Sequence, residues 1–207
     1  MKGNILIACY SYSGKTRKIA EVIQEQTGGR LSQIYPRQPY PADFERLLNQ
    51  VREESRSGKF PTLLPVTESA DQYDVIFAGS PNWCGTIAPP LAAWLKGNDM
   101  TGKLLLPFFS HCGGEDKGME QAVRKLCPAA KMGSSLYVLE NGRENLQYIV
   151  QTWLEENFLE KERKVDNGEC RKEKNEIKIK DQTGSRSSDD PGAFIPDGVS
   201  ALGRNGP

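Results

Sequence analysis

The stretch that decides the fold is ILIACYSYSGKT, which runs from Ile5 to Thr16. An apolar run ends in small and hydroxyl-bearing residues, and an amphipathic stretch follows at once, so the pattern predicts a β-strand, a short turn and a helix. Ser11, Ser13 and Thr16 offer hydroxyl donors, and Gly14 lets the backbone pass close to a ligand. Because the first amides of a helix lack intrahelical acceptors, this junction is typical of a phosphate-binding loop for a nucleotide or flavin.

Two other interpretations of this loop are possible from the sequence. Gly14-Lys15-Thr16 spells GKT, but a Walker A loop needs glycine five positions before Gly14, where Cys9 stands. Nucleoside triphosphate hydrolysis is therefore disfavoured. A purely structural strand-to-helix turn, capped by Ser13, accounts for the loop equally well.

Composition excludes several classes of partner. The chain has 207 residues, 37% hydrophobic and 26% charged, with 27 basic and 27 acidic side chains, so charge gives no argument for nucleic acid or an anionic membrane. No apolar stretch reaches the roughly 18 residues that span a bilayer, and no signal-peptide pattern precedes the first strand. Five cysteines without a CxxC pair indicate reduced thiols, and we expect a cytoplasmic protein without membrane insertion.

Apolar and amphipathic stretches alternate from Gly3 to about Phe158, which predicts an α/β protein with five parallel strands covered by helices on both faces. The predicted strands are Asn4–Tyr10, Arg30–Ile34, Val75–Gly79, Leu104–Phe109 and Ser135–Leu139. The predicted helices are Thr16–Gln26, Ala42–Ser55, Pro90–Lys96, Lys117–Leu126 and Glu144–Asn157. Trp94 and Trp153 lie in these helices and are expected in the core, and Cys9 and Cys127 are expected to be buried.

Two units are predicted, a folded domain at 1–158 and a tail at 159–207. The tail is polar and contains few clustered apolar residues, so it cannot bury enough surface to offset the entropy of ordering. We expect most of it to be disordered.

In a doubly wound sheet, ligands bind outside the carboxyl ends of the strands, where three unusual loops occur. They are SYSGKT at 11–16, SPNWCGT at 80–86 and SHCGGED at 110–116. With these loops and the PYP segment at 39–41, residues 3 to 157 resemble the flavodoxin family, especially the branch with YSYSGNTRKIA, GxPNW and THGG-type motifs. The resemblance implies a flavodoxin-like three-layer sandwich with strand order 2-1-3-4-5.

The resemblance also implies FMN as cofactor, with the first loop on the 5′-phosphate and the other two around the isoalloxazine ring. The matching positions are Ser11, Tyr12, Ser13, Gly14, Lys15 and Thr16, then Pro81, Asn82, Trp83, Cys84 and Gly85, then Ser110, His111, Cys112, Gly113 and Gly114. Trp83 is the expected ring-stacking residue. The family often has tryptophan at the position of Cys84 and glycine at that of Cys112, so flavin tuning here is expected to differ.

Several residues in these loops have alternative roles. His111, the only histidine, is either a flavin O2 contact or proton donor, or a solvated loop residue. Tyr12 either covers the phosphate and ribityl chain or is merely exposed. Cys84 and Cys112 form a redox-sensitive pair if the loops bring them together.

The primary prediction is an FMN-binding electron carrier that exchanges electrons with a redox protein donor and acceptor. Residues 1–158 carry seventeen acidic and seventeen basic side chains, so docking steered by a negative face is not expected. The alternatives are an FMN-dependent NAD(P)H:quinone oxidoreductase acting on a small quinone-like substrate, and a cofactor-free domain that binds only protein partners. No acid–base constellation for catalysis is predicted.

Overall fold

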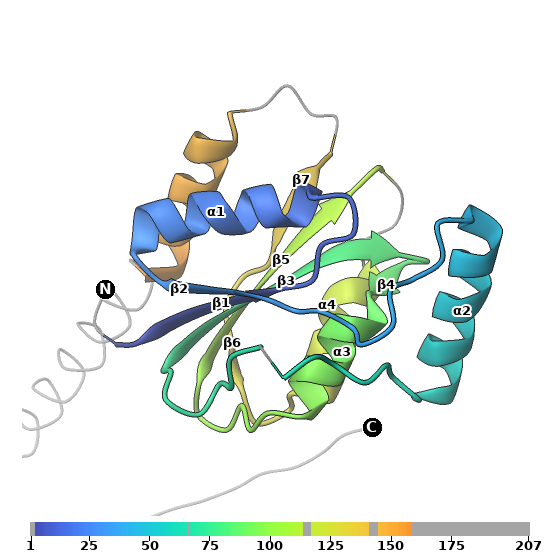
Figure 1. Cartoon of the computed structure of the whole chain (residues 1–207). Coiled ribbons are helices and arrows are strands. Elements are labelled where there is room, and N and C mark those ends of the chain that lie inside the picture. The colour runs from blue at the N-terminus through green and yellow to red at the C-terminus, as the bar shows by residue number, and fades with distance from the viewer. Residues whose placement is uncertain (1–2, 66, 114–116, 141–144, 159–207) are drawn as a thin grey trace, which may run out of the picture. The chain divides into compact units, whose positions relative to one another are not determined.

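The computed structural model describes residues 3–65, 67–113, 117–140 and 145–158. Strands and helices alternate along them (Figure 1). The strands are β1 (Ile5–Cys9), β2 (Arg30–Gln33), β3 (Val75–Trp83), β4 (Thr86–Ile87), β5 (Leu104–His111), β6 (Lys131–Met132) and β7 (Leu136–Leu139). The helices are α1 (Lys15–Thr27), α2 (Phe44–Ser57), α3 (Pro89–Lys96) and α4 (Lys117–Leu126), and residues 146–158 are also helical. The predicted tail at 159–207 lies outside the described residues and stays a prediction.

The sheet has the predicted order and parallel direction, but more strands than predicted. Its order is β2-β1-β3-β5-β6, and β7 also pairs with β5. β6 pairs with the start of β5 and β7 with its end, so the two share the fifth position. Between β6 and β7, the backbone amide of Ser134 donates a hydrogen bond to the side-chain oxygen of Asn157, at 2.9 Å. The prediction of five strands is therefore wrong in number, because the fifth is interrupted and β4 is added.

β4 arises because β3 continues beyond its predicted end at Gly79. Pro81 still pairs with Ser110 of β5, and the chain then reverses at Cys84 and Gly85 into an antiparallel pair with β4. Both turn residues have positive φ, 56° and 77°, as a two-residue hairpin requires. Hence Pro81, Asn82 and Trp83 belong to a strand rather than to a loop.

Alternate residues of the strands bury against opposite layers of helices. Ile7, Phe77 and Leu106 pack with α1 and the helix at 146–158, while Leu6 and Ile76 pack in the core that includes α3 and α4. Figure 1 shows α1 and the helix at 146–158 together on one side of the sheet, with α3 and α4 on the other. This confirms the predicted three-layer α/β sandwich.

The predicted core residues lie where expected. Trp94 and Trp153 are buried, and their indole N–H groups donate to backbone carbonyls of Glu68 and Ser134 at 3.0 and 2.9 Å. Cys9 and Cys127 are buried as well. In the described part of the chain, no helix is long and apolar enough to cross a membrane.

Candidate cofactor-binding site

The first loop delivers the N-terminus of α1 to the carboxyl edge of the sheet. Gly14 occupies the N-cap position with φ of 85°, and no side chain caps it. The hydroxyl of Ser11 accepts from the backbone amide of Arg17 at 3.2 Å, so the prediction that Ser13 is the cap is wrong. Ser13 is exposed instead. Among the first amides of α1, which lack intrahelical acceptors, that of Arg17 is thus bonded to Ser11, while those of Lys15 and Thr16 follow the exposed hydroxyl of Ser13 closely along the chain.

Thr16 differs from the other hydroxyls of this loop because it is buried, with 1% exposed surface. Its Oγ1 lies 2.9 Å from the Oγ of Ser110, a buried residue near the end of β5. This contact ties the first turn of α1 directly to the third predicted loop.

The second predicted loop is the hairpin between β3 and β4. The side-chain oxygen of Asn82 accepts from the backbone amide of Gly85 at 3.0 Å. Buried Ser80 donates to the carbonyl of Pro81 and accepts from the amide of Ala88, both at 2.8 Å. These bonds stabilise the hairpin next to the end of β5.

The third predicted loop begins inside β5, because Ser110 and His111 are strand residues. Beyond the strand, the amide of Gly113 donates to Nδ1 of His111 at 3.3 Å, and Gly113 has φ of 104°. Cys112 is exposed. Gly114 lies outside the described residues, so its predicted role is untested.

Trp83 is surrounded by three tyrosines in edge-to-face geometry. Its ring centroid lies 5.1 Å from that of Tyr40, 5.3 Å from Tyr10 and 5.7 Å from Tyr12. Tyr12 also donates a hydrogen bond to the carbonyl of Pro41 at 3.2 Å. The cluster therefore joins the first loop, the PYP segment and the β3–β4 hairpin.

Two tyrosines of this cluster, Tyr10 and Tyr40, are held in their neutral form. Burial raises the pKa of Tyr40, and its hydrogen bond to Glu54, at 2.5 Å, raises the pKa further. Burial likewise raises the pKa of Tyr10. Glu54 also accepts from the side-chain amide of Gln50 at 2.8 Å. A neutral aromatic wall suits a flat, uncharged ring system.

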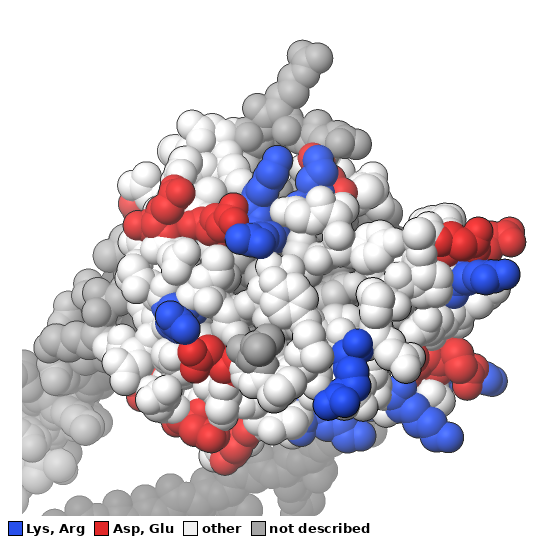
Figure 2. Space-filling view, viewed as in Figure 1, with Lys and Arg blue, Asp and Glu red and all other residues white. Residues whose placement is uncertain are grey.

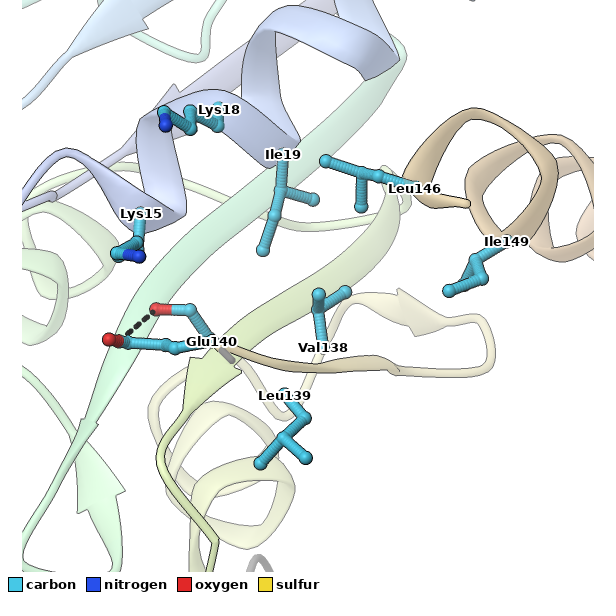
Figure 3. Close-up of a pocket in the computed structure, with 9 residues that line it drawn as sticks. Lys15, Lys18, Ile19, Val138, Leu139, Glu140, Leu146 and Ile149 are labelled. Atoms are coloured by element: carbon cyan, nitrogen blue, oxygen red, sulfur yellow. Dashed lines mark hydrogen bonds between the residues drawn. The ribbon is translucent and has the colours of Figure 1, made fainter. Parts of the chain in front are cut away.

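A pocket of ≈160 Å³ adjoins the first turn of α1 on the β7 side (Figure 3). Its polar lining comes from Lys15, Lys18, Ser110 and Glu140. Ser110 donates to Oε1 of Glu140 at 3.3 Å. Trp83 does not line this pocket. The pocket is therefore not the predicted binding site of the isoalloxazine ring.

Cys112, just beyond the end of β5, interacts with two of the residues that line this pocket. Its pKa is raised, first by burial and then by Glu140, with which it also shares a hydrogen bond, while Lys15 acts in the opposite sense. Cys84 stands at the hairpin on the β3 side. This arrangement gives no support to a Cys84–Cys112 pair, which stays an untested hypothesis.

The described residues fit a phosphorylated aromatic cofactor. Exposed Ser13 and the early amides of α1 suit an anionic group, and an added Cβ at Gly14 would meet nothing within 4 Å, so the backbone there is open. Trp83 and Tyr12 meet beside this loop at the same edge of the sheet. Phosphate and ring contacts of the predicted residues stay predictions.

Charged side chains of both signs occur on the face of the molecule seen in Figure 2. Figure 2 shows basic and acidic side chains interspersed over the visible face, without a broad area of one sign. The structure thus gives no sign of a negative docking face in this view.

Sequence reasoning missed three residues beside the site. Tyr10 and Tyr40 pack on Trp83, and Glu140 accepts from Ser110. The PYP motif was a signal for Tyr40, since it follows an extended connection that must pass near the sheet edge. Nothing in the sequence connects Glu140 with Ser110, which is thirty positions away.

Comparison with known proteins agrees with this architecture. A family model described as flavodoxin matches residues 4–157. No curated protein matches the chain at a significant level.

Solved structures of flavoproteins share the fold. A candidate flavoprotein of Bacteroides eggerthii is 26% identical, with a TM-score of 0.65 over 74% of this chain and 97% of that one. A flavoprotein of Lactobacillus acidophilus in complex with FMN is 22% identical, with a TM-score of 0.59 over 66% and 93%. A candidate flavoprotein of Bacteroides uniformis is 22% identical, with a TM-score of 0.64 over 73% and 99%. Since the family model covers well over half of the sequence, the chain belongs to the flavodoxin family.

Proposed function

We propose that this protein binds FMN at the carboxyl edge of its sheet and serves as an electron carrier. One observation carries the proposal: three segments distant in sequence meet there, through the Thr16–Ser110 hydrogen bond and the contact of Tyr12 with Trp83. The family match and the FMN complex of a similar fold support it.

The chain's own residues bind and orient the cofactor. The phosphate is held by the early amides of α1 and the hydroxyls of its preceding loop, without a dedicated arginine. Trp83 and Tyr12 offer aromatic contact to the ring, and their neighbours Tyr10 and Tyr40 keep Trp83 from turning away. FMN, when bound, supplies the redox chemistry by accepting one or two electrons.

A second function, quinone reduction with NAD(P)H, is favoured by one feature. Classical carriers attract basic partners with a negative face, whereas charges here are balanced and interspersed. A small, neutral quinone-type substrate needs no such face. For either function we propose a cytoplasmic location, which agrees with cysteines that lack a disulfide pattern.

The test begins with the full-length protein, incubated with FMN and desalted, whose absorbance spectrum is then recorded. We expect bound flavin, and an anaerobic reductive titration with two resolved one-electron steps. A single two-electron step, together with steady NAD(P)H oxidation in the presence of a quinone, would replace the carrier by the reductase. Absence of bound flavin would reject both and leave the cofactor-free partner-binding domain.

A further inference from the structure

A short chain of side chains links the first turn of α1 to β7 beneath the proposed phosphate site. Thr16 Oγ1 lies 2.9 Å from Ser110 Oγ, and Ser110 Oγ lies 3.3 Å from Oε1 of Glu140. Thr16 and Ser110 are both 1% exposed. Solvent therefore contributes little to the orientation of the two hydroxyl protons. Their orientation depends on the hydrogen bonds among Thr16, Ser110 and Glu140.

The charge of Glu140 decides which way these protons point. An ionised carboxylate can only accept, so Ser110 donates to it, and the Thr16 hydroxyl then donates to Ser110. When Glu140 is protonated, the order can reverse, so that Glu140 donates to Ser110 and Ser110 donates to Thr16. The two hydroxyl dipoles then point the opposite way.

A bound phosphate discriminates between these two arrangements. It is negatively charged, so the carboxylate of Glu140 and hydroxyl dipoles whose hydrogens point toward that carboxylate both oppose it. Protonation of Glu140 removes the negative charge and reverses both hydroxyl dipoles, and this effect acts through space because the Thr16 hydroxyl is buried. Both effects strengthen the binding of the phosphate.

Other charged and polar groups also lie near Glu140. Lys15 and Lys18 of α1 line the same pocket. Beyond the end of β5, the thiol of Cys112 interacts with Glu140. The carbonyl of His111 accepts a hydrogen bond from the backbone amide of Glu140 at 2.8 Å. A His111→Gln variant measures the contribution of the imidazole separately. The residues that β7 and the helix at 146–158 add to the lining are apolar.

We infer that Glu140 is a positioning residue of the phosphate site, coupling FMN binding to proton uptake through the hydroxyls of Ser110 and Thr16. The inference rests on the proposed function, since it takes FMN as the ligand. It assigns to Glu140 a preference for FMN at lower pH and a penalty at higher pH.

The experiment measures the dissociation constant of FMN by flavin fluorescence at pH 5 to 8, for wild type, Glu140→Gln and Ser110→Ala. The FMN phosphate titrates with a pKa of about 6 in every sample, so the informative quantity is the ratio of wild-type to variant constants. In Glu140→Gln the amide can donate to Ser110 at every pH. We expect that variant to bind FMN about tenfold more tightly than wild type at pH 8, with the ratio shrinking toward pH 5.

Three controls isolate the mechanism. Riboflavin lacks the phosphate, so Glu140→Gln should leave its affinity unchanged within about twofold. Ser110→Ala breaks the chain, and its pH profile should be shallower than that of wild type. In a His111→Gln background, the Glu140→Gln substitution should still change the FMN affinity as it does in the wild-type background. Calorimetry in buffers of different ionisation enthalpy should show more proton uptake on FMN binding by wild type than by Glu140→Gln.

The outcomes separate this inference from the proposed function. Three results would overturn the coupling while leaving FMN binding intact. Wild type and Glu140→Gln could bind FMN equally at every pH, or Glu140→Gln could change the affinity for riboflavin as much as that for FMN. The pH dependence of FMN binding by Ser110→Ala could also equal that of wild type. Loss of the difference in His111→Gln would transfer the effect to His111 and overturn the role of Glu140. Absence of FMN binding in all proteins would overturn the inference and the proposed function together.

Discussion

At the scale of single residues, Trp83 has an unusual concentration of contacts for a half-buried side chain. Three tyrosine rings lie within 5.7 Å of its centroid, and they come from two segments, the connection between β1 and α1 and the PYP segment. Aromatic pairs of this geometry contribute roughly 0.5–1.5 kcal/mol each beyond the burial of area. Trp83 therefore stabilises the site as well as offering a surface to the cofactor.

Trp83→Ala should lower the free energy of unfolding of the apoprotein by about 2–3 kcal/mol and weaken FMN binding about tenfold. Urea denaturation and fluorescence titration measure the two effects. Trp83→Phe keeps an aromatic ring and should lose less than half as much stability. A variant with wild-type stability and affinity would mean that Trp83 contributes neither to packing nor to the cofactor.

Cys84 is strained for a different reason. It has φ of 56°, and among the described residues it is the one non-glycine residue with positive φ. Left-handed backbone costs most residues about 1 kcal/mol, and asparagine tolerates it best.

Cys84→Asn should therefore raise the free energy of unfolding by about 0.5–1 kcal/mol, measured by urea denaturation. Cys112→Asn is the matched control, because Cys112 is also exposed but lies outside the left-handed region. Cys112→Asn should not raise the free energy of unfolding. Equal effects of both substitutions would indicate a general cost of exposed thiols instead of backbone strain.

At the scale of elements, the β3–β4 hairpin depends on one buried hydroxyl. Ser80 satisfies the amide of Ala88 and the carbonyl of Pro81 across the base of the hairpin, and its side chain is fully buried. Asn82 and Gly85 close the tip. The hairpin thus has polar bonds at both ends, which hold Trp83 between them.

Ser80→Ala leaves the Ala88 amide buried without its acceptor and should destabilise the protein by about 2 kcal/mol. Hydrogen exchange at Ala88 should accelerate, and urea denaturation gives the free energy of unfolding. Ser69→Ala is the control, because exposed Ser69 donates to Asn98 at 3.2 Å and its loss should cost less than about 0.5 kcal/mol. Unchanged exchange at Ala88 would show that water replaces the hydroxyl.

At the scale of the whole molecule, several acidic groups are buried in their neutral form. Burial raises the pKa of Cys9 to about 12 and that of Cys127 to about 11, from an ordinary value of 9.0. Burial raises the pKa values of Tyr10 and Tyr40 as well. Below pH 9 the thiols are neutral in both states, so their stabilising effect is complete there. Above pH 9 they ionise in the unfolded chain first, and stability falls.

The free energy of unfolding should decline between pH 9 and 12, with Cys9 contributing about 1.4 kcal/mol per pH unit. Denaturant titrations at successive pH values measure this slope. Cys9→Ala is expected to be less stable at neutral pH because of the lost packing, yet its slope should be shallower. Parallel slopes for the two proteins would contradict the assignment to Cys9.

Much of the fold followed from local pattern. Continuous apolar runs identified β1, β3 and β5, and helical periodicity with glycine stops located α1 to α4 within one or two residues, as at Lys117–Leu126. The strand order came from the family resemblance and is confirmed. Patterns failed where long-range pairing decides the structure: the extension of β3 past Pro81 depends on its partner β5, and the break between β6 and β7 depends on Asn157.

The sequence by itself determined the layers, the loop that precedes α1 and the burial of Cys9 and Trp94, because periodicity and residue type act over a few neighbouring positions. Tertiary structure alone decided that Tyr40 and Tyr10 enclose Trp83, that Thr16 turns its hydroxyl inward to Ser110, and that Glu140 completes that chain. These partners are separated by tens of residues. Hydrogen bonds and ring contacts act over only a few ångströms, so such groups meet only after the sheet has brought the ends of its strands together.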